Sequence, residues 1–384
     1  PPPNPPPTPP NTTSISSAAS DVYKRQVICT SLNMGGSEKQ AVWLSNKLSD
    51  NGYRVFFVSL KDAGILSETL NSNIVVKNFK LAKAKNVYYK MFYFILGIIR
   101  LIKLVNKYKI SKTVTFLFHS NLVGKIVKTF SFHKNVHIAS FRSDRLSKRD
   151  SNISKLRTLI FRNFILDNNT TVVFNSISGS SKLNLKNTIQ EVIFNFPLNP
   201  KQDKNIFDNK FVYIGRLDEL KNVRNIVLGF TKLETLDATL DIYGKGPDFP
   251  KIQEIIEQHS LEDKVSLKGV DADISNNLNN YDALMLGSTH EAFPNVIIEA
   301  FNAGVIPIST NVGDVEWLIK KERGILIEGF TSSEIAKSMT KFLELDIESR
   351  KKYIANGRNF LIKELNEKDI FCLLYTSDAA DDDR

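Results

Sequence analysis

The chain has 384 residues, two cysteines and a formal net charge of +10. This length is sufficient for two domains, each with its own hydrophobic core. Only Cys29 lies inside the part of the chain that we expect to be native, which excludes a disulfide framework and indicates a reducing compartment.

Both ends of the chain resemble translations of one transposon sequencing adapter. Read in opposite directions, the adapter encodes residues 18–26 and residues 372–384. The Pro-rich stretch before residue 18 lies outside the adapter and is interpreted as part of the same artefact. We therefore expect residues 1–26 and 372–384 to be non-native, and we base the fold on residues 27–371.

Charge is distributed very unevenly over the remaining chain. Residues 27–204 have a net charge of +19, whereas residues 205–371 have a net charge of −7. An asymmetry of this size predicts that the first half faces an anionic partner. Nucleic acid, a phospholipid surface and a phosphorylated acceptor all remain possible from charge alone.

The first half alternates short apolar runs with longer helical patterns, which is typical of a parallel sheet covered by helices. The predicted strands are residues 27–30, 55–60, 114–118, 137–141 and 171–174. Helices are predicted at residues 37–51 and 87–108. This N-terminal domain is expected to cover residues 27–196, and the polar, Pro-containing stretch 197–210 is expected to be a linker.

The most hydrophobic segment of the chain is residues 88–105. Lys90, Arg100 and Lys103 interrupt it before it reaches the length needed to span a bilayer. We predict a core helix that covers the first sheet, and the alternative is an amphipathic helix that lies on a membrane surface.

A second alternating set follows the linker. Its predicted strands are residues 211–214, 239–243, 265–267, 283–286, 305–309 and 324–327, and its predicted helices are residues 222–233, 248–259 and 295–303. This C-terminal domain is expected at residues 211–345, followed by a helix within residues 346–371 that returns to the first domain. The fold class predicted is α/β, with two Rossmann-like domains in tandem and a cleft between them.

Glu299 is the most unusual residue of the predicted helix 295–303. Pro294 suits the first helical position, and the neighbouring residues of the helix are almost all apolar. A buried carboxylate without a partner is costly, so Glu299 is expected to bind a polar ligand. Glu291 places a second carboxylate ahead of the same helix start, where anions are readily held.

The residues around this pair resemble glycosyltransferase family 4, a family of retaining enzymes with the GT-B fold. Glu291 and Glu299 match its E-x7-E motif within the block Ser288-Thr-His-Glu-Ala-Phe-Pro-Asn, and the similarity continues through Gly304, Pro307 and Val312-Gly-Asp-Val-Glu. Gly215-Arg-Leu-Asp-Glu-Leu-Lys-Asn resembles a second motif of the family. The resemblance covers most of residues 27–329 and is weaker in the first half.

The resemblance implies a role for each matching residue. Arg216 and Lys221 would contact the diphosphate of a nucleotide-sugar donor, Glu291 would bind the transferred sugar, and His119, after a predicted strand, would lie near that sugar. The further donor-binding residues are expected to be Gly35, Gly36, Val270, Phe293, Asn295, Val296 and Glu299. Three residues that follow first-half strands are expected to face the acceptor, namely Arg142, Arg145 and Asn175.

Each of these residues also has a purely structural interpretation. Arg216 could simply pair with Asp218 or Glu219 on an exposed turn, a glycine pair often precedes a helix, and a histidine at a strand end is often half-buried. An ion pair with Asp144 would equally explain the arginines expected at the acceptor.

The activity implied is transfer of a hexose with retention of configuration, from a UDP-sugar in preference to other donors, to a glycan or polyprenyl-diphosphate-linked acceptor. No residues have the types and spacing of a metal site, and the family uses no metal or other cofactor. The basic first half is expected to hold the enzyme peripherally at the inner, cytoplasmic face of a bacterial membrane in surface polysaccharide biosynthesis. The alternatives are a sugar-nucleotide 2-epimerase of the same fold and a basic nucleic-acid-binding protein. The complete E-x7-E block disfavours the first, and the absence of any nucleic-acid-binding module disfavours the second.

Overall fold

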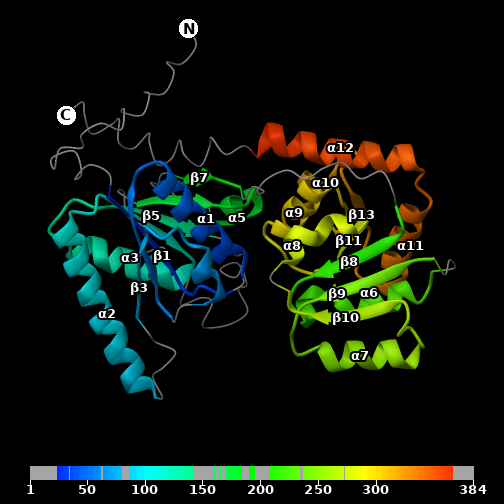
Figure 1. Cartoon of the computed structure of the whole chain (residues 1–384), viewed down its shortest axis with the longest axis horizontal. Helices are drawn as coiled ribbons and strands as arrows, with labels where there is room; N and C mark the ends of the chain where they lie inside the picture. Colours follow the sequence, from blue (N-terminus) through cyan, green and yellow to red (C-terminus); the bar gives the residue numbers. More distant parts are fainter. Residues whose placement is uncertain are drawn as a thin grey trace, which may run out of the picture. The chain divides into compact units, whose positions relative to one another are not determined.

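The computed structural model describes residues 24–33, 35–61, 64–79, 86–141, 159, 160, 165, 170–183, 190–194, 207–233, 237–271 and 273–365. The chain forms two compact units. Unit 1 contains Pro1–Ser140 and Ile160–Thr171, and unit 2 contains Phe141–Leu159 and Val172–Arg384. Figure 1 shows the two sheets and their helices.

The first sheet contains seven strands in the order β3-β2-β1-β4-β5-β6-β7. These are β1 (Lys24–Cys29), β2 (Arg54–Ser59), β3 (Val75–Asn78), β4 (Lys112–Phe116), β5 (Val136–Phe141), β6 (Thr170–Phe174) and β7 (Gln190–Val192). The helices along this part of the chain are α1 (Gly36–Asp50), α2 (Val87–Tyr108), α3 (Phe118–Phe130) and α5 (Ile177–Leu183), with a short 3₁₀ helix at Ile65–Thr69.

The second sheet contains six strands in the order β10-β9-β8-β11-β12-β13. These are β8 (Lys210–Ile214), β9 (Thr239–Tyr243), β10 (Val265–Gly269), β11 (Ala283–Leu286), β12 (Ile306–Thr310) and β13 (Ile325–Ile327). Its helices are α6 (Val223–Phe230), α7 (Phe249–Gln258), α8 (Ile274–Asn277), α9 (Asn295–Ala303), α10 (Val315–Ile319), α11 (Ser332–Leu343) and α12 (Ile347–Glu364), with 3₁₀ helices at Glu219–Lys221 and Leu278–Asn280.

Both sheets share one topological feature, which is a reversal of strand order after the third strand. β8 pairs in parallel with β9 on one side and with β11 on the other. The loops that leave β8 and β11 therefore diverge from a common point at the carboxyl edge of the sheet, where open α/β sheets bind their ligands. The predicted fold class, α/β with two parallel Rossmann-like sheets, is confirmed.

Helix boundaries around the second sheet follow ordinary capping rules. Gly304 adopts a left-handed conformation with φ of 71° and ends α9. Thr331 and Glu334 form a reciprocal capping box at the start of α11, and these hydrogen bonds lower the pKa of the Glu334 carboxyl. The side chain of Asp346 accepts a hydrogen bond from the Ser349 amide at the start of α12.

Several predicted elements coincide with the observed ones, and other predictions need correction. The bounds of α2, β9, β11 and α9 match the predicted ranges. β4 ends at Phe116 instead of residue 118, so His119 lies in the first turn of α3 and not in a strand-end loop. Pro294 precedes the first residue of α9 as its N-cap and is not the first helical residue. Sequence reasoning missed β3 and β7, which are short strands at the two ends of the first sheet.

α2 confirms the prediction of a core helix for one of its faces. Ile98, Leu101 and Val105 are buried and join the cluster that contains Phe56 and Phe79. In the part of the chain that the structure describes, no helix is long and apolar enough to cross a bilayer.

β1 begins at Lys24, three residues earlier than the predicted strand, and so includes residues that sequence analysis set aside as adapter-encoded. Lys24, Arg25 and Gln26 are all buried in this central strand. Strands covered on both faces are normally continuous runs of apolar residues. Gln26 has its Oε1 atom bonded to the Thr113 hydroxyl at 3.1 Å, but its buried Nε2 atom has no partner among the described residues.

This buried amide generates a prediction about stability. The double variant Gln26→Met/Thr113→Val removes both polar groups while keeping similar shapes, so the free energy of unfolding should rise by about 1 kcal/mol. Thr113→Val alone should lower it, because the amide then loses its remaining side-chain partner. Denaturant titration of the three proteins measures both effects, and a double variant less stable than the starting chain would contradict the prediction.

Candidate donor-binding site

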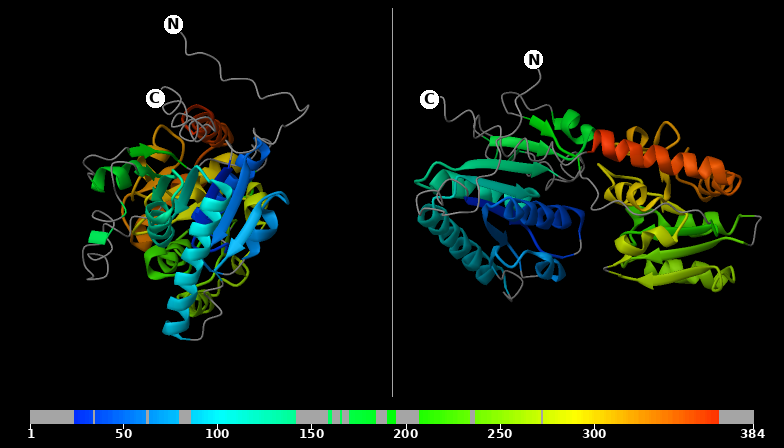
Figure 2. Two further views of the ribbon diagram at one scale, coloured as in Figure 1. Left: turned by 90° about the vertical axis from the view of Figure 1, so that its left-hand side faces the viewer. Right: turned by 45° about the horizontal axis from the view of Figure 1, so that its top comes forward.

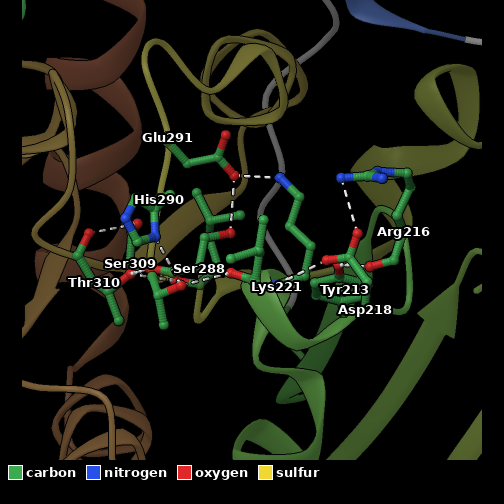
Figure 3. A network of polar contacts seen from close by, with 12 residues as sticks. Tyr213, Arg216, Asp218, Lys221, Ser288, His290, Glu291, Ser309 and Thr310 are labelled. Atoms are coloured by element: carbon green, nitrogen blue, oxygen red, sulfur yellow. Dashed lines mark hydrogen bonds and ion pairs between the residues drawn. The ribbon is translucent and has the colours of Figure 1, made fainter. Parts of the chain in front are cut away.

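The candidate site is built from the loops that follow β8 and β11 in unit 2. The first loop contains Arg216 and runs into the 3₁₀ helix Glu219–Lys221, and the second runs from Gly287 to the start of α9. Because β8 and β11 are neighbours at the strand-order reversal, their loops bring Arg216, Lys221 and Glu291 to one edge of the sheet (Figure 3).

An ion pair joins the two loops directly. The ammonium of Lys221 contacts Oε1 of Glu291, and the buried hydroxyl of Ser288 donates to the same oxygen at 2.8 Å. The two charged side chains are only 20% and 15% exposed, so water screens this pair less than it screens a surface pair. Glu291 is thereby fixed between a cation and a hydroxyl donor.

Backbone contacts hold the same two loops in register. The amide of Thr289 donates to the carbonyl of Leu220 at 2.8 Å, and the hydroxyl of Thr310 donates to the carbonyl of Ser288 at 2.6 Å. The ion pair of Lys221 and Glu291 therefore lies on a framework of hydrogen bonds that join the loop after β11 to Thr310 of β12 and to the Glu219–Lys221 turn.

Arg216 is more exposed and pairs with Asp218. Its guanidinium lies 2.8 Å from the Asp218 carboxylate, and the two side chains are 58% and 18% exposed. The structural interpretation of Arg216, an ion pair with Asp218, is thus realised. A surface ion pair of this kind contributes about 0–1 kcal/mol, so an anion of higher charge can readily take the place of Asp218.

Tyr213 supports the Arg216 loop from below. Its side chain is fully buried in β8, and its hydroxyl donates to the Arg216 carbonyl at 2.8 Å. Burial raises the pKa of Tyr213 well above its ordinary value, with smaller contributions from the Glu291 and Asp218 charges. The tyrosine therefore stays protonated and remains a hydrogen-bond donor.

Glycines allow the loop after β9 to pack directly against the Arg216 loop. A Cβ atom on Gly244 would lie 1.8 Å from the Gly215 carbonyl oxygen, and one on Gly246 would lie 2.1 Å from that of Leu217. These close approaches explain why both positions are glycine.

One face of α9 remains open beside these loops. Asn295, Val296 and Glu299 are half-buried and share this face, because Glu299 lies four residues after Asn295 and three after Val296, whereas the other described residues of the helix are buried. Glu299 is therefore not enclosed by apolar residues as predicted. Its carboxylate accepts a hydrogen bond at 3.0 Å from the hydroxyl of Ser275 in α8.

The remaining donor-site predictions in unit 2 are Phe293 and Val270. Phe293 is buried and stacks on Phe194, which also stacks on Trp317. Val270 follows β10 and is exposed. Gly313 has φ of 59°, and a Cβ atom there would lie 2.4 Å from the Glu291 carbonyl oxygen, which explains the glycine in the Val312-Gly-Asp block.

Two predicted residues of unit 1 lie at the start of α1. Gly35 is the N-cap in extended conformation, and Gly36 is the first helical residue. The Glu38 carboxylate folds back toward Gly35, accepts a hydrogen bond from Ser31 at 3.1 Å, and has its pKa raised by burial.

The other predictions in the first half are less easily placed. His119 is exposed in α3, and Asn175 is buried directly after β6. Arg142 and Arg145, expected at the acceptor, lie outside the described residues.

Ser275, Ser288 and Tyr213 were not given roles by sequence reasoning. Each acts on a predicted residue, as the donor to Glu299, the donor to Glu291 and the support of Arg216. Tyr213 carries a weak signal, since it is a polar residue in an otherwise apolar strand. Ser275 carries none, because its sequence distance from Glu299 predicts no contact.

The chemistry available at this edge of the sheet is recognition of a polyhydroxylated anion. Two cations can hold a diphosphate, and two carboxylates can accept hydrogen bonds from sugar hydroxyls. Within the described ranges, no three His, Cys, Asp or Glu side chains gather as metal ligands would. Metal independence stays a prediction.

The chain is similar in sequence to several known proteins. The chain is 30% identical over 135 residues to N-acetyl-alpha-D-glucosaminyl L-malate synthase of Bacillus anthracis, a match that covers 35% of each chain. It is 26% identical over 191 residues to N-acetylgalactosamine-N,N'-diacetylbacillosaminyl-diphospho-undecaprenol 4-alpha-N-acetylgalactosaminyltransferase of Campylobacter jejuni, a match that covers 44% of this chain and 52% of that protein. The match thus spans about a third of the length of the Bacillus anthracis protein and about half of that of the Campylobacter jejuni protein.

The fold is also found among solved structures. The crystal structure of Anabaena Alr3699/HepE in complex with UDP-glucose superposes with a TM-score of 0.77 at 16% sequence identity and covers 93% of this chain and 99% of that one. At this identity the likeness shows the GT-B fold alone. Residues 197–360, which contain the ion-paired loops and α9, match the model of the family described as glycosyl transferases group 1. The resemblance first seen around Glu291 and Glu299 is confirmed, and residues 197–360 of the chain belong to the glycosyl transferases group 1 family, glycosyltransferase family 4.

Proposed function

We propose that the protein is a retaining glycosyltransferase that transfers a hexose from a UDP-sugar to a glycan or lipid-linked acceptor. The observation that carries the proposal is the convergence of Lys221, Glu291 and Ser288 at the strand-order reversal of the second sheet. Family membership and the UDP-glucose complex named for Anabaena HepE support UDP as the nucleotide.

Donor binding would exchange the present ion pairs for contacts to the diphosphate. Arg216 is held by Asp218 and Lys221 by Glu291. A diphosphate carries more charge than either carboxylate and accepts bidentate hydrogen bonds from a guanidinium. Lys221 would turn from Glu291 to the phosphate, which frees Glu291 to accept hydrogen bonds from the sugar.

The open face of α9 would bind the nucleoside. Glu299, oriented by the Ser275 hydroxyl, would accept hydrogen bonds from the ribose hydroxyls. The amides at the start of the same helix, at Asn295 and Val296, would stabilise the negative charge that develops on the leaving diphosphate.

Retention of configuration can arise in two ways. Double displacement needs a carboxylate nucleophile at the anomeric carbon. Glu291, which is bound by the Ser288 hydroxyl, is the proposed ligand of the sugar hydroxyls, and Glu299 is the proposed ribose ligand. We therefore favour attack on the face of the departing diphosphate, whose oxygen takes the proton of the acceptor hydroxyl.

The acceptor is proposed from charge and similarity together. Residues 27–204 have a net charge of +19, which suits a phosphorylated or lipid-diphosphate acceptor. The Campylobacter jejuni relative is named for a diphospho-undecaprenol acceptor. We propose a polyprenyl-diphosphate-linked glycan, handled at the inner face of the cytoplasmic membrane during surface polysaccharide synthesis.

The ribose role of Glu299 predicts a loss of nucleotide affinity. Glu299→Ala should weaken UDP binding about 10- to 100-fold, because hydrogen bonds to a charged group contribute about 1.5–3 kcal/mol. Titration calorimetry with UDP measures the change. Glu344→Ala, at an exposed position just after α11, serves as the matched control and should keep the original affinity. Equal affinity of the two variants would remove Glu299 from the nucleotide site.

The diphosphate role of Arg216 predicts a kinetic effect. Arg216→Ala should lower kcat about 10²- to 10³-fold, since the guanidinium stabilises charge that grows as the glycosidic bond breaks. Lys352→Ala removes another exposed cation with a carboxylate partner at 2.8 Å and is expected to leave turnover unchanged. The rate is measured as the UDP released by donor hydrolysis or by sugar transfer. Wild-type turnover of Arg216→Ala would place the diphosphate elsewhere.

A further inference from the structure

α2 in unit 1 has an apolar face that the core does not use. Its buried stripe, Ile98, Leu101 and Val105, covers the first sheet. A second stripe lies about a third of a turn away and contains Tyr88, Met91, Phe92, Ile95 and Ile99. We call these five residues the outer stripe. Their i, i+3, i+4, i+7 and i+11 spacing places them in one row along the helix.

The outer stripe is open to solvent over its whole length. Tyr88 is 81% exposed, Phe92 60% and Ile95 53%. Tyr89 and Tyr93, which flank the row, are also exposed. Figure 1 shows the N-terminal end of α2, drawn in cyan, reaching past the strands of the first sheet, and Figure 2 shows the same end from two other sides. A contiguous row of large apolar side chains on an exposed helix marks an interaction surface.

The residue types in and beside the outer stripe are those found at the interface between a bilayer and water. Tyrosine places an apolar ring in the bilayer boundary and its hydroxyl in the headgroup layer. The aromatic part of the helix is its N-terminal half, and the exposed Arg100, Lys103 and Lys107 follow in the C-terminal half. Long basic side chains of this kind keep their charge at the headgroup level while their stems contact the apolar layer.

The surrounding sequence adds charge complementarity for an anionic surface. Between Glu68 and Asp144 the chain contains 14 Lys and Arg residues and no Asp or Glu. An anionic lipid surface attracts such a segment with a binding free energy of about 1 kcal/mol for each basic residue that lies near it. A second copy of the same chain would place two strongly basic segments side by side, which disfavours a dimer through this face.

We propose that the outer stripe of α2 docks the protein onto an anionic phospholipid bilayer, with the helix lying in the interface and its basic residues at the headgroups. The helix has charges at three positions in its C-terminal half and is not apolar enough to cross a bilayer. It would therefore lie on the membrane surface. The inference deepens the proposed function, since a lipid-linked acceptor is met at a bilayer surface.

Vesicle flotation of the full chain tests the proposal. Two kinds of vesicle are compared. Neutral vesicles contain phosphatidylcholine alone, and anionic vesicles contain phosphatidylcholine with about 30% phosphatidylglycerol. The unmodified chain should float with the anionic vesicles and at least about tenfold less with the neutral ones. Phe92→Ser/Ile95→Ser should lose about tenfold or more of the partitioning, because two large side chains no longer enter the interface.

Two matched variants separate the stripe from general surface effects. Ile347→Ser/Ile362→Ser changes two residues of α12 that are similarly exposed, at 55% and 73%, and should float like the unmodified chain. Arg100→Gln/Lys103→Gln should weaken flotation on anionic vesicles, whereas Lys320→Gln/Lys341→Gln, at exposed positions of unit 2, should not. Circular dichroism and the thermal midpoint verify that every variant is folded.

Several outcomes would overturn the proposal. Equal flotation of Phe92→Ser/Ile95→Ser and Ile347→Ser/Ile362→Ser would show that the stripe does not contact lipid. A concentration-dependent dimer that only the stripe variant abolishes, without vesicle binding by the unmodified chain, would assign the face to a second copy. UDP affinity is measured on the same proteins to separate the docking proposal from the proposed function. Loss of docking with intact UDP binding would contradict only the docking proposal, and loss of UDP binding with intact docking would contradict only the proposed function.

Discussion

The candidate site depends on the ion pair between Lys221 and Glu291. These residues lie 70 positions apart in the sequence, and they meet because β8 and β11 are neighbours whose following loops leave the same edge of the sheet. The pair is largely shielded from solvent and is reinforced by Ser288, so each charge keeps the other in place until a stronger partner arrives. In the proposed donor complex, a diphosphate is such a partner for the lysine, and the carboxylate is then free to accept hydrogen bonds from sugar hydroxyls. We propose that this arrangement already positions both side chains for the donor.

Much of this site could be predicted from the sequence. The alternating apolar runs predicted both parallel sheets. The bounds of β11 follow from a continuous apolar run before Gly287, and those of α9 follow from a mostly apolar stretch between Pro294 and Gly304. The E-x7-E spacing placed Glu291 before the helix and Glu299 inside it, which the structure shows. The pattern could not reveal the environment of Glu299. Its hydrogen-bond donor Ser275 lies in a different helix, α8, and the periodicity of α9 says nothing about that contact.

Other errors have equally physical causes. The run through Phe118 looked like one strand because its apolar residues are continuous, but the backbone turns at Leu117, which has a positive φ of 72°, and α3 begins there. The strand therefore ends earlier and His119 becomes a helical residue. For α2, hydrophobicity predicted burial, yet a helix offers only part of its circumference to a sheet. The aromatic residues on the remaining face stay exposed, and only the tertiary structure separates the two faces.

The two units thus present different kinds of surface. Unit 2 carries hydrogen-bonding groups fixed by backbone contacts, which suits a small polar ligand. Unit 1 carries an exposed aromatic row beside a segment that lacks acidic residues, which suits an extended anionic interface. A crystal structure of the full chain with UDP tests the central claim most directly. The account predicts that Lys221 leaves Glu291 for the diphosphate and that Glu299 accepts hydrogen bonds from the ribose hydroxyls. UDP bound away from α9, with the Lys221–Glu291 pair intact, would contradict it.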